Sequence, residues 1–460
     1  MNTNHTNQYM DLTGLLMKYN VPVPRYTSYP TVPCWHDTIS REQWTNNLSA
    51  RYAATADKGL SLYIHLPYCE SLCTYCGCNK KITTNHDVED RYITALLAEW
   101  ELYKAALPGK PLIRELHLGG GTPTFFSPAN LQQMLSGIFN GCDIHTDHEF
   151  SFEGHPNNTT AEHLQTLYDM GFRRVSFGVQ DNDPEVQRVI NRIQPFENVK
   201  RVTELARQIG YQSVNFDLIY GLPLQTPESI KRTIEQTLTL HPDRVAFYSY
   251  AHVPWTARGQ RLFDESHLPD ADTKMQLYKL GKELFTNAGY ADIGMDHFSL
   301  PTDSLYKASQ KGRLFRNFMG YTTTDSEILI GLGVSSISDT GNAFAQNSKT
   351  IHDYYASVEA GTLDVKKGYF LTDEDIAFRH SILDITCRGF AQLNSEYAGV
   401  IVDYVLPELR KLEQDELVKI DGYDIIVTSL GRHFIRNIAS AFDLYIQRSA
   451  ATQLKFSKAI

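Results

Sequence analysis

Four cysteines lie within ten positions of the 460-residue chain, in the order Cys69-x3-Cys73-x2-Cys76-x-Cys78. Thiolates this close together on one loop can face a single centre, and they select zinc or iron–sulfur clusters over hard cations. A structural zinc site usually takes two separated C-x2-C pairs, and this sequence offers no second pair. An iron–sulfur cube held by only three cysteines leaves one iron open to a further ligand. The spacing therefore favours a 4Fe–4S centre on Cys69, Cys73 and Cys76 over zinc.

A second motif, Gly119-Gly120-Gly121-Thr122-Pro123-Thr124, follows the second expected strand. It is neither a G-x-G-x-x-G fingerprint nor a Walker loop, and by itself it predicts no more than a tight turn. Three glycines, however, remove side chains from the backbone and let it approach a bound small molecule closely. A glycine loop beside a cysteine loop is much more specific than either motif alone.

The elements that position these motifs repeat along the chain. Short β-branched or aromatic runs predict strands over residues 62–66, 114–118, 149–153, 174–179, 214–220 and 245–250. Most are followed by helical spacing of apolar residues, over 90–107, 128–139, 161–170, 196–209 and 227–240. We predict an α/β fold, an open (β/α)6 partial TIM-type barrel, because one uniform run of units ends at about residue 250 and the motif residues cluster just after the strands. Parallel barrels carry their chemistry at these strand ends. A doubly wound sheet is the alternative, and it would need the chain to return to the middle of the sheet.

Three segments make up the expected domain organisation. Residues 1–60 are expected to form an extended N-terminal arm, since prolines occur at positions 22, 24, 30 and 33 and disfavour helix before them. Residues 61–365 hold the barrel and its extension. Residues 366–460 are expected to form a mostly helical, winged-helix-like domain with a hairpin at Asp421-Gly422.

The composition narrows the class of protein. Lys and Arg total 43 against 53 for Asp and Glu, giving a formal charge of -10, so nucleic acid is an unexpected partner. No run of about 18 apolar residues predicts a membrane span. The start, MNTNHTNQYM, lacks the basic segment followed by an apolar segment that is typical of a signal peptide, so we expect a cytoplasmic protein. The isolated Cys34, Cys142 and Cys387 are interpreted as ordinary buried thiols.

The C-x3-C-x2-C spacing, with the aromatic Tyr75 before the third cysteine, is the signature of the radical S-adenosylmethionine (SAM) superfamily. From about residue 15 to 460 the chain also resembles the oxygen-independent coproporphyrinogen III oxidase family. The matching segments are 25–30 (RYTSYP), 63–67 (YIHLP), 76–78 (CGC), 119–124 (GGGTPT), 178–181 (GVQD), 217–223 (DLIYGLP), 294–298 (GMDHF), 316–323 (RNFMGYTT) and 331–337 (GLGVSSI). One departure is Gly154-His155-Pro156, where the family more often has an acidic residue before the proline.

The resemblance implies one 4Fe–4S cluster on Cys69, Cys73 and Cys76 and two SAM molecules. It implies SAM contacts at Tyr63, Tyr75, Cys78, Gly120, Gly121, Thr122, Glu153, Gln180, Arg192, Asp217, Ala251 and Ile337. Arg192 is expected on the helix after the fourth strand. Asp217 interrupts an apolar strand, where a carboxylate is costly unless it is paired. Cys78 is open to two interpretations, a proton or electron participant or a packed small residue.

The implied reaction turns two propionates of coproporphyrinogen III into the vinyls of protoporphyrinogen IX, an oxidoreductase step of heme biosynthesis. Candidate substrate contacts, chosen for charge and position, are Arg25, Tyr26, Tyr29, Lys80, Lys81 and Arg316. Tyr26 and Tyr29 either close over the macrocycle or simply pack. A monomer is expected, with an unidentified electron donor and acceptor.

Two rival functions remain open on sequence grounds. One is a heme-binding chaperone of the same fold, whose members tend to lack the arm and to replace the fourth cysteine; Cys78 and residues 25–30 argue against it. The other is a radical SAM tetrapyrrole methyltransferase or heme-degrading enzyme, which the local spacing does not exclude.

Overall fold

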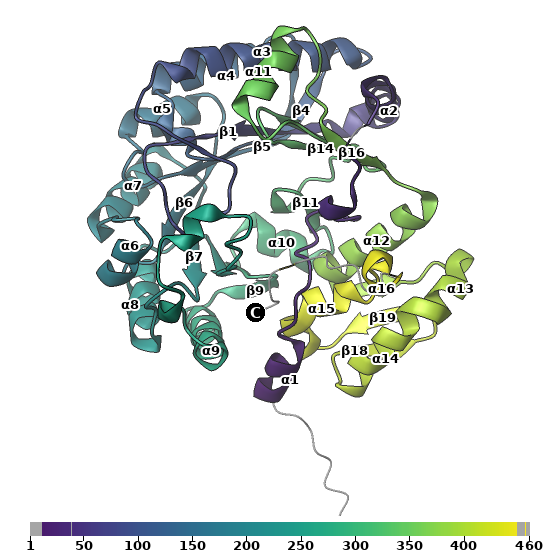
Figure 1. Cartoon of the computed structure of the whole chain (residues 1–460). Helices are drawn as coiled ribbons and strands as arrows, with labels where there is room; N and C mark the ends of the chain where they lie inside the picture. Colours follow the sequence, from purple (N-terminus) through teal and green to yellow (C-terminus); the bar gives the residue numbers. More distant parts are fainter. Residues whose placement is uncertain (1–11, 38, 449–455, 457–460) are drawn as a thin grey trace, which may run out of the picture. The chain divides into compact units, whose positions relative to one another are not determined.

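The computed structural model describes residues 12–37, 39–448 and 456 (Figure 1). The segment MNTNHTNQYM, where no signal peptide is expected, lies outside the described residues. The chain forms two compact units, one from the described parts of 1–34 and 373–460 and one from 35–372. The expected arm is therefore divided, because residues up to 34 belong with the C-terminal segment.

A twelve-stranded sheet organises the larger unit. Its centre consists of parallel strands in chain order: β1 (Leu60–Leu66), β4 (Leu112–Gly120), β5 (Asp143–Gly154), β6 (Arg174–Gln180), β7 (Ser213–Tyr220) and β8 (Arg244–Ser249). All six expected strands are present, and the α/β class is confirmed. The chain does not return to the middle between them, which is not the order of a doubly wound sheet.

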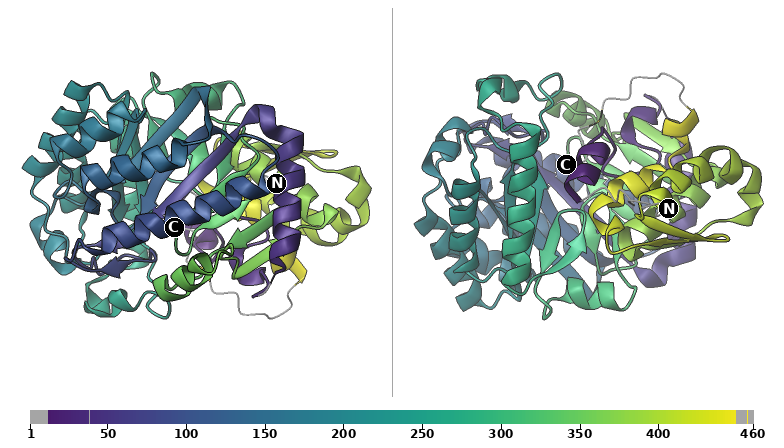
Figure 2. Two further views of the ribbon diagram at one scale, coloured as in Figure 1. Left: turned by 90° about the horizontal axis from the view of Figure 1, so that it is seen from above. Right: turned by 90° about the horizontal axis from the view of Figure 1, so that it is seen from below.

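Helices connect these strands and cover the outer face of the sheet (Figures 1 and 2). They are α3 (Val88–Ala106), α4 (Pro128–Phe139), α5 (Ala161–Asp169), α6 (Pro184–Val189), α7 (Phe196–Ile209) and α8 (Pro227–Leu238). Helix α4 illustrates the local logic: the Ser127 side chain caps its first turn, and Leu131, Leu135 and Ile138 follow at helical spacing and are buried.

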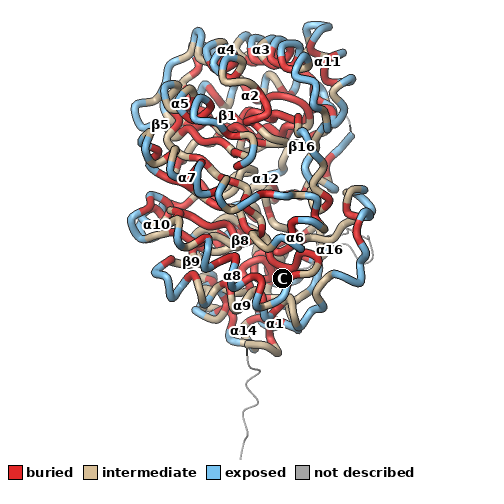
Figure 3. The backbone as a smooth tube through the Cα atoms, turned by 90° about the vertical axis from the view of Figure 1, so that its left-hand side faces the viewer, coloured by how far each residue is buried: buried red, intermediate tan, exposed pale blue. Residues whose placement is uncertain are grey.

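The strands alternate between an apolar outer face and a polar inner face. In β6, Val175, Phe177 and Val179 are buried, whereas Ser176 and Gly178 between them are half-buried. Strand β7 follows the same period of two, with Asp217 on its less buried face. Figure 3 shows the strands of the larger unit as mostly buried backbone. The polar side chains of several strands therefore meet inside the unit.

Additional elements extend the sheet at both edges. Beyond β1 lie β13 (Leu329–Leu332), β14 (Ile337–Asp339), β15 (Ala343–Gln346) and β16 (Lys367–Phe370), and beyond β8 lie β10 (His297–Ser299) and β9 (Ala291–Gly294). The same unit contains α2 (Arg41–Thr55), β2 (Tyr68–Cys69), β3 (Lys81–Ile82), α9 (Ala271–Asn287), α10 (Ser304–Gln310), β11 (Phe315–Asn317), β12 (Gly320–Thr322) and α11 (Ile351–Glu359). Strand β13 pairs parallel to β1. The strand–helix repeat of the sequence ends before residue 260, so this pairing lies outside the repeat.

The smaller unit combines helices with a three-stranded antiparallel sheet in the order β17-β19-β18. Its elements are α1 (Leu12–Tyr19), α12 (Asp373–Arg388), β17 (Phe390–Gln392), α13 (Ala398–Val400), α14 (Leu406–Gln414), β18 (Val418–Asp421), β19 (Asp424–Val427), α15 (Ile435–Ser440) and α16 (Leu444–Arg448). The expected hairpin is present, with Gly422 at a φ of 61° in its turn. None of the described helices is both long and apolar enough to cross a membrane.

Residues of the expected arm form part of this unit's core. The Tyr26 hydroxyl donates to Asp443 Oδ2 at 3.0 Å, and the Leu444 amide donates to the Tyr29 hydroxyl at 3.2 Å. Arg436 donates to the Val23 carbonyl at 2.5 Å. Segments more than 400 residues apart in the chain are thus joined by buried hydrogen bonds.

Candidate active site

The cysteine loop runs between β1 and α3 and is fixed on two sides. On one side, the Thr83 amide donates to the Cys69 carbonyl at 2.9 Å across the β2–β3 pair. On the other, Asn191 donates to the Leu72 carbonyl at 2.8 Å and the Thr74 amide donates to the Ile190 carbonyl at 2.9 Å. The loop is therefore held at the carboxyl ends of the parallel strands, where such sheets place their chemistry.

A cavity of about 620 Å³ joins this loop to the ends of β4, β5 and β6 and to the middle of β7. The sequence-predicted residues that line it are Cys69, Cys73, Tyr75, Cys76, Cys78, Lys80, Gly120, Gly121, Thr122, Glu153, Gln180, Arg192 and Asp217. Sequence reasoning missed other lining residues, among them His155, Asn157, Asn158 and Ile193. Only their position in the chain, shortly after β5 and α6, could have indicated that they line the cavity.

Each of the three predicted cluster ligands has a polar neighbour. Thr122 Oγ1 donates to Cys69 Sγ at 3.3 Å, and Arg192 Nη1 donates to Cys73 Sγ at 3.5 Å. A hydrogen bond from the Cys78 thiol lowers the pKa of Cys76 to about 6. Burial raises the pKa of Cys69 to about 11, so binding of a metal centre there releases a proton. The arrangement favours the thiolate form of Cys76 before any metal is considered.

Close packing against the end of β1 requires glycine at two positions of the glycine loop. Gly120 has a φ of +110°, and a Cβ on it would lie 2.7 Å from the His65 ring. A Cβ on Gly121 would lie 2.6 Å from the carbonyl of Pro67. The Gly121 amide donates to the Leu66 carbonyl at 2.8 Å. The sequence interpretation attributed these glycines to a bound molecule, and the structure adds that no side chain fits against the end of β1.

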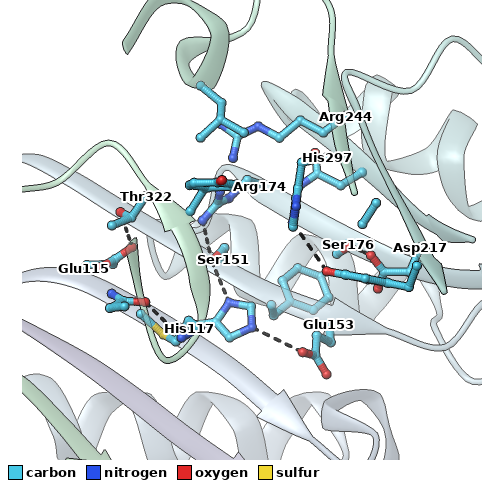
Figure 4. Close-up of a pocket in the computed structure, with 18 residues that line it drawn as sticks. Glu115, His117, Ser151, Glu153, Arg174, Ser176, Asp217, Arg244, His297 and Thr322 are labelled. Atoms are coloured by element: carbon cyan, nitrogen blue, oxygen red, sulfur yellow. Dashed lines mark hydrogen bonds and ion pairs between the residues drawn. The ribbon is translucent and has the colours of Figure 1, made fainter. Parts of the chain in front are cut away.

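A hydrogen-bonded relay reaches Glu153 from inside the sheet, in a cavity of about 130 Å³ (Figure 4). Arg174 Nη2 donates to Ser151 Oγ at 3.1 Å, and that oxygen lies 2.8 Å from His117 Nδ1. An ionised carboxylate only accepts hydrogen bonds, so we assign an imidazole proton to the Nε2 atom that faces Glu153. Nε2 lies 3.5 Å from Glu153 Oε1.

The two carboxylates shared by both cavities have opposite pKa shifts. Burial raises the pKa of Glu153, but the hydrogen bond and charge of His117 outweigh it, so its pKa lies below the usual range. Burial and the nearby charge of Glu153 raise the pKa of Asp217 to about 7, against a hydrogen bond from Ser176. Glu153 is therefore held ionised, whereas Asp217 is partly protonated near neutral pH.

The structure corrects the expected position of Arg192 on a helix. It lies in the loop between α6 and α7 and not on a helix. Its Nη2 donates to the Gly178 carbonyl at 2.6 Å. Its Nε is buried with no hydrogen-bond partner among the described residues. A loop position lets the guanidinium reach both the fourth strand and Cys73.

Several predicted residues do not line the cavity. Tyr63 is buried, stacks on the His117 ring at 6.1 Å and places its hydroxyl 3.1 Å from His65 Nδ1. The Ala251 carbonyl accepts from Gln260, which also donates to the Tyr75 carbonyl at 2.9 Å.

The other predicted residues outside the lining are spread over both units. Ile337 is buried in β14, Arg316 lies over the Tyr321 ring in the β11–β12 hairpin, and Lys81 is in β3. Arg25, Tyr26 and Tyr29 belong to the smaller unit.

The chain is similar to known proteins in both sequence and structure. Residues 63–237 match the family model of the radical SAM superfamily. The chain is 37% identical to the oxygen-independent coproporphyrinogen III oxidase of Pseudomonas aeruginosa, over 97% of this chain and 98% of that protein. It is 39% identical to the protein of the same name from Helicobacter pylori, over 94% of this chain and 96% of that protein.

A solved structure of similar shape is the coproporphyrinogen III oxidase of Escherichia coli, described as a radical SAM enzyme. It superposes with a TM-score of 0.87 at 37% identity, covering 94% of this chain and 98% of that one. The chain belongs to the oxygen-independent coproporphyrinogen III oxidase family. The resemblance stated from the sequence motifs is confirmed.

Membership of this family implies a 4Fe–4S cluster and SAM, and the residues present fit both. Across the described ranges, no three His, Cys, Asp or Glu side chains are grouped so that they could hold a single metal ion. A tetrahedral zinc would need its sulfurs within about 4 Å of one another. The three cysteines instead line one cavity with the glycine loop and two carboxylates, which suits a bulkier cluster and a polar ligand.

Proposed function

We propose that this chain converts coproporphyrinogen III to protoporphyrinogen IX without oxygen, by turning two propionates into vinyl groups. The observation that carries the proposal is the family similarity, which extends over nearly the whole chain. The cavity supports it, because it gathers the cysteine loop, the glycine loop and the carboxylates Glu153 and Asp217. The activity belongs to porphyrin and heme biosynthesis and makes the chain an oxidoreductase.

Cys69, Cys73 and Cys76 are the proposed cluster ligands. When bound, the cluster and SAM would supply the electron and the 5′-deoxyadenosyl radical that removes a hydrogen atom from a propionate β-carbon; carbon dioxide then leaves, and the remaining electron passes to an external one-electron acceptor. Thr122 and Arg192 donate to two of the sulfurs and hold them in place. The loop contacts at Leu72 and Thr74 keep the three ligands on one side of the cavity.

Glu153 and Asp217 are the proposed polar partners of SAM. Because His117 keeps Glu153 ionised, its carboxylate can accept hydrogen bonds from an ammonium group or from ribose hydroxyls. Asp217, with a pKa near 7, can accept from a hydroxyl or donate to one. Gln180, with a φ of 65°, and the buried Nε of Arg192 offer further donors at the same cavity.

The family resemblance also leads us to propose two SAM molecules. Support comes from the two carboxylates of the cavity, which lie on separate strands. We further propose that the six parallel strands form an open partial barrel, since they follow in chain order and the sheet ends at β9 and β16. The monomeric state remains a prediction from the resemblance, and the cytoplasmic location remains a prediction from the sequence pattern.

Product analysis tests the proposed activity. The chain is reconstituted anaerobically with iron and sulfide and incubated with a reductant, SAM and coproporphyrinogen III, with Cys76→Ala protein as the matched control. We expect a divinyl product, carbon dioxide and 5′-deoxyadenosine from the native chain alone. A methylated or opened ring, or unmodified bound heme, would instead favour the rival functions and reject the proposal.

A further inference from the structure

A larger cavity lies on the other side of the cysteine loop. This outer groove has a volume of about 800 Å³ and is lined by Pro67, Tyr68, Asn79, Lys80, Lys81, Thr83, Asn85, Asp87, Val88, Arg91, Lys349, Thr350, Ile351, His352, Tyr355, Ala356 and Glu359. Its walls come from β2–β3, α3 and α11, and α3 and α11 lie side by side in Figure 1. Arg91 of α3 lies 4.4 Å from the Tyr355 ring of α11.

A residue that lines the outer groove directly precedes a predicted cluster ligand in β2. Tyr68, in the groove lining, pairs with Lys81 in the β2–β3 ladder, and the next pair joins Cys69 to Ile82. Lys80 lines both the outer groove and the inner cavity, and its Nζ donates to the Cys76 carbonyl at 3.1 Å. The groove is therefore the surface from which the backbone of the cysteine loop is directly reached.

The charge of the groove is opposite to that of the chain. Its lining holds Lys80, Lys81, Lys349 and Arg91 against the acidic Asp87 and Glu359, whereas the whole chain has a formal charge of -10. Arg91 is paired with Glu359 at 2.7 Å, which leaves three lysines facing one further carboxylate. Lys81 and Lys349 are exposed. A local positive field on an acidic protein selects a negatively charged partner and speeds its approach.

We propose that the outer groove docks a small acidic electron-carrier protein that reduces the cluster. This inference rests on the proposed function, in which each SAM cleavage consumes one electron. The carrier is oxidised by one electron and the cluster is reduced by one, with no bond made or broken. Apart from the proposed cluster, no group of three or more metal-ligating side chains occurs in the described parts of the chain that could store this electron.

Charge reversal tests the docking surface. The double variant Lys81→Glu/Lys349→Glu is compared with Lys200→Glu/Lys311→Glu, which makes the same change at exposed lysines in and after other helices. Reduction of the reconstituted cluster by a reduced, acidic plant-type 2Fe–2S ferredoxin is followed by stopped-flow absorbance. We expect the groove variant to react about tenfold more slowly at low ionic strength, with the difference shrinking in high salt. Dithionite should reduce all three proteins at equal rates.

A direct readout is carbodiimide cross-linking of the oxidised ferredoxin to the full chain, with the linked lysines mapped by mass spectrometry. Cross-links at Lys81 and Lys349 support the proposal. Cross-links elsewhere, or an equal loss of rate in the control variant, would overturn it. These assays contain no coproporphyrinogen, so a failure here is distinguishable from a failure of the proposed function, which the product analysis detects.

Discussion

The cysteine loop and the Arg25–Pro30 segment are both dense motifs, but the structure uses their polar atoms differently. In the larger unit, the thiols of the loop line a cavity together with Glu153 and Asp217. In the smaller unit, the hydroxyls of Tyr26 and Tyr29 are bonded to Asp443 and to the Leu444 amide. A motif that leaves its polar groups facing a cavity is suited to a ligand, whereas one whose polar groups are satisfied internally is suited to packing.

The exposed fractions of the side chains show that the polar groups around the Arg25–Pro30 segment are buried. Tyr26 is 3% exposed, Tyr29 is 2% exposed and Asp443 is 1% exposed, so these groups lie inside their unit. Burial and the charge of Asp443 raise the pKa of Tyr26, and burial also raises the pKa of Asp443, to about 6. We propose that the segment's tyrosines stabilise the smaller unit, which is the packing alternative left open by the sequence.

Removing a sulfur from the cavity gives the largest expected effect. In Cys76→Ala we expect loss of the iron–sulfur chromophore and of SAM cleavage, because the cluster loses one of three ligands. Cys387→Ala, at an isolated thiol of the smaller unit, is the matched control and should keep both. Iron content, visible absorbance and 5′-deoxyadenosine are measured after anaerobic reconstitution. Full iron content in Cys76→Ala would contradict the proposed ligand set.

Glu153→Gln should come next in size. The amide keeps the shape but loses the charge that a bound ammonium or hydroxyl requires. A hydrogen bond to a charged group contributes about 1.5 to 3 kcal/mol, so we expect SAM to bind about 10- to 100-fold more weakly. Glu162→Gln, at an exposed position in the first turn of α5, serves as control. Equilibrium dialysis of SAM on the reconstituted protein gives the answer, and unchanged affinity would remove Glu153 from the site.

The sequence predicted which residues line one cavity better than it predicted the elements around that cavity. The period of two in strands such as β6 and the spacing of Cys69, Cys73 and Cys76 are local signals, and local signals survive without knowledge of the fold. The strands that extend the large sheet after β8 were not predicted, because β13 joins β1 from far along the chain and carries no repeat.

Two other details were beyond local pattern. The pairing of Tyr26 with Asp443 depends on a contact across more than 400 residues. The place of Arg192 in a loop could not be derived either, since a short helix, α6, ends just before it.

The relay behind Glu153 predicts a smaller, coupled effect. If His117 acts only by holding Glu153, then His117→Phe should weaken SAM binding, and His117→Phe/Glu153→Gln should lose no more than Glu153→Gln alone. Ser151→Ala, which removes the hydrogen-bond partner of Nδ1, should cost about 0.5 to 1.5 kcal/mol, or about two- to tenfold in affinity. Thermal unfolding of each variant is the companion measurement. Additive losses in the double variant would mean that His117 has a separate role.

The smallest effect on SAM cleavage is expected for Tyr26→Phe, whose consequence should appear in stability. Asp443 has a raised pKa of about 6 in the folded unit against 3.8 for an ordinary Asp, so the folded state holds this proton more tightly. Stability therefore falls as pH rises from about 4 to about 6, and above that range the buried carboxylate depends on the Tyr26 hydroxyl.

Removal of that hydroxyl should cost about 1.5 to 3 kcal/mol at pH 7.5, where Asp443 is ionised, and about 0.5 to 1.5 kcal/mol at pH 5, where it is mostly protonated. Tyr29→Phe is the matched control, because its hydroxyl accepts from a backbone amide and its loss should be the same at both pH values. Urea unfolding of the cluster-free chain at the two pH values measures both variants. An equal loss for Tyr26→Phe at pH 5 and 7.5, or a raised KM for coproporphyrinogen III at unchanged stability, would return this segment to the substrate site and remove its contrast with the cysteine loop.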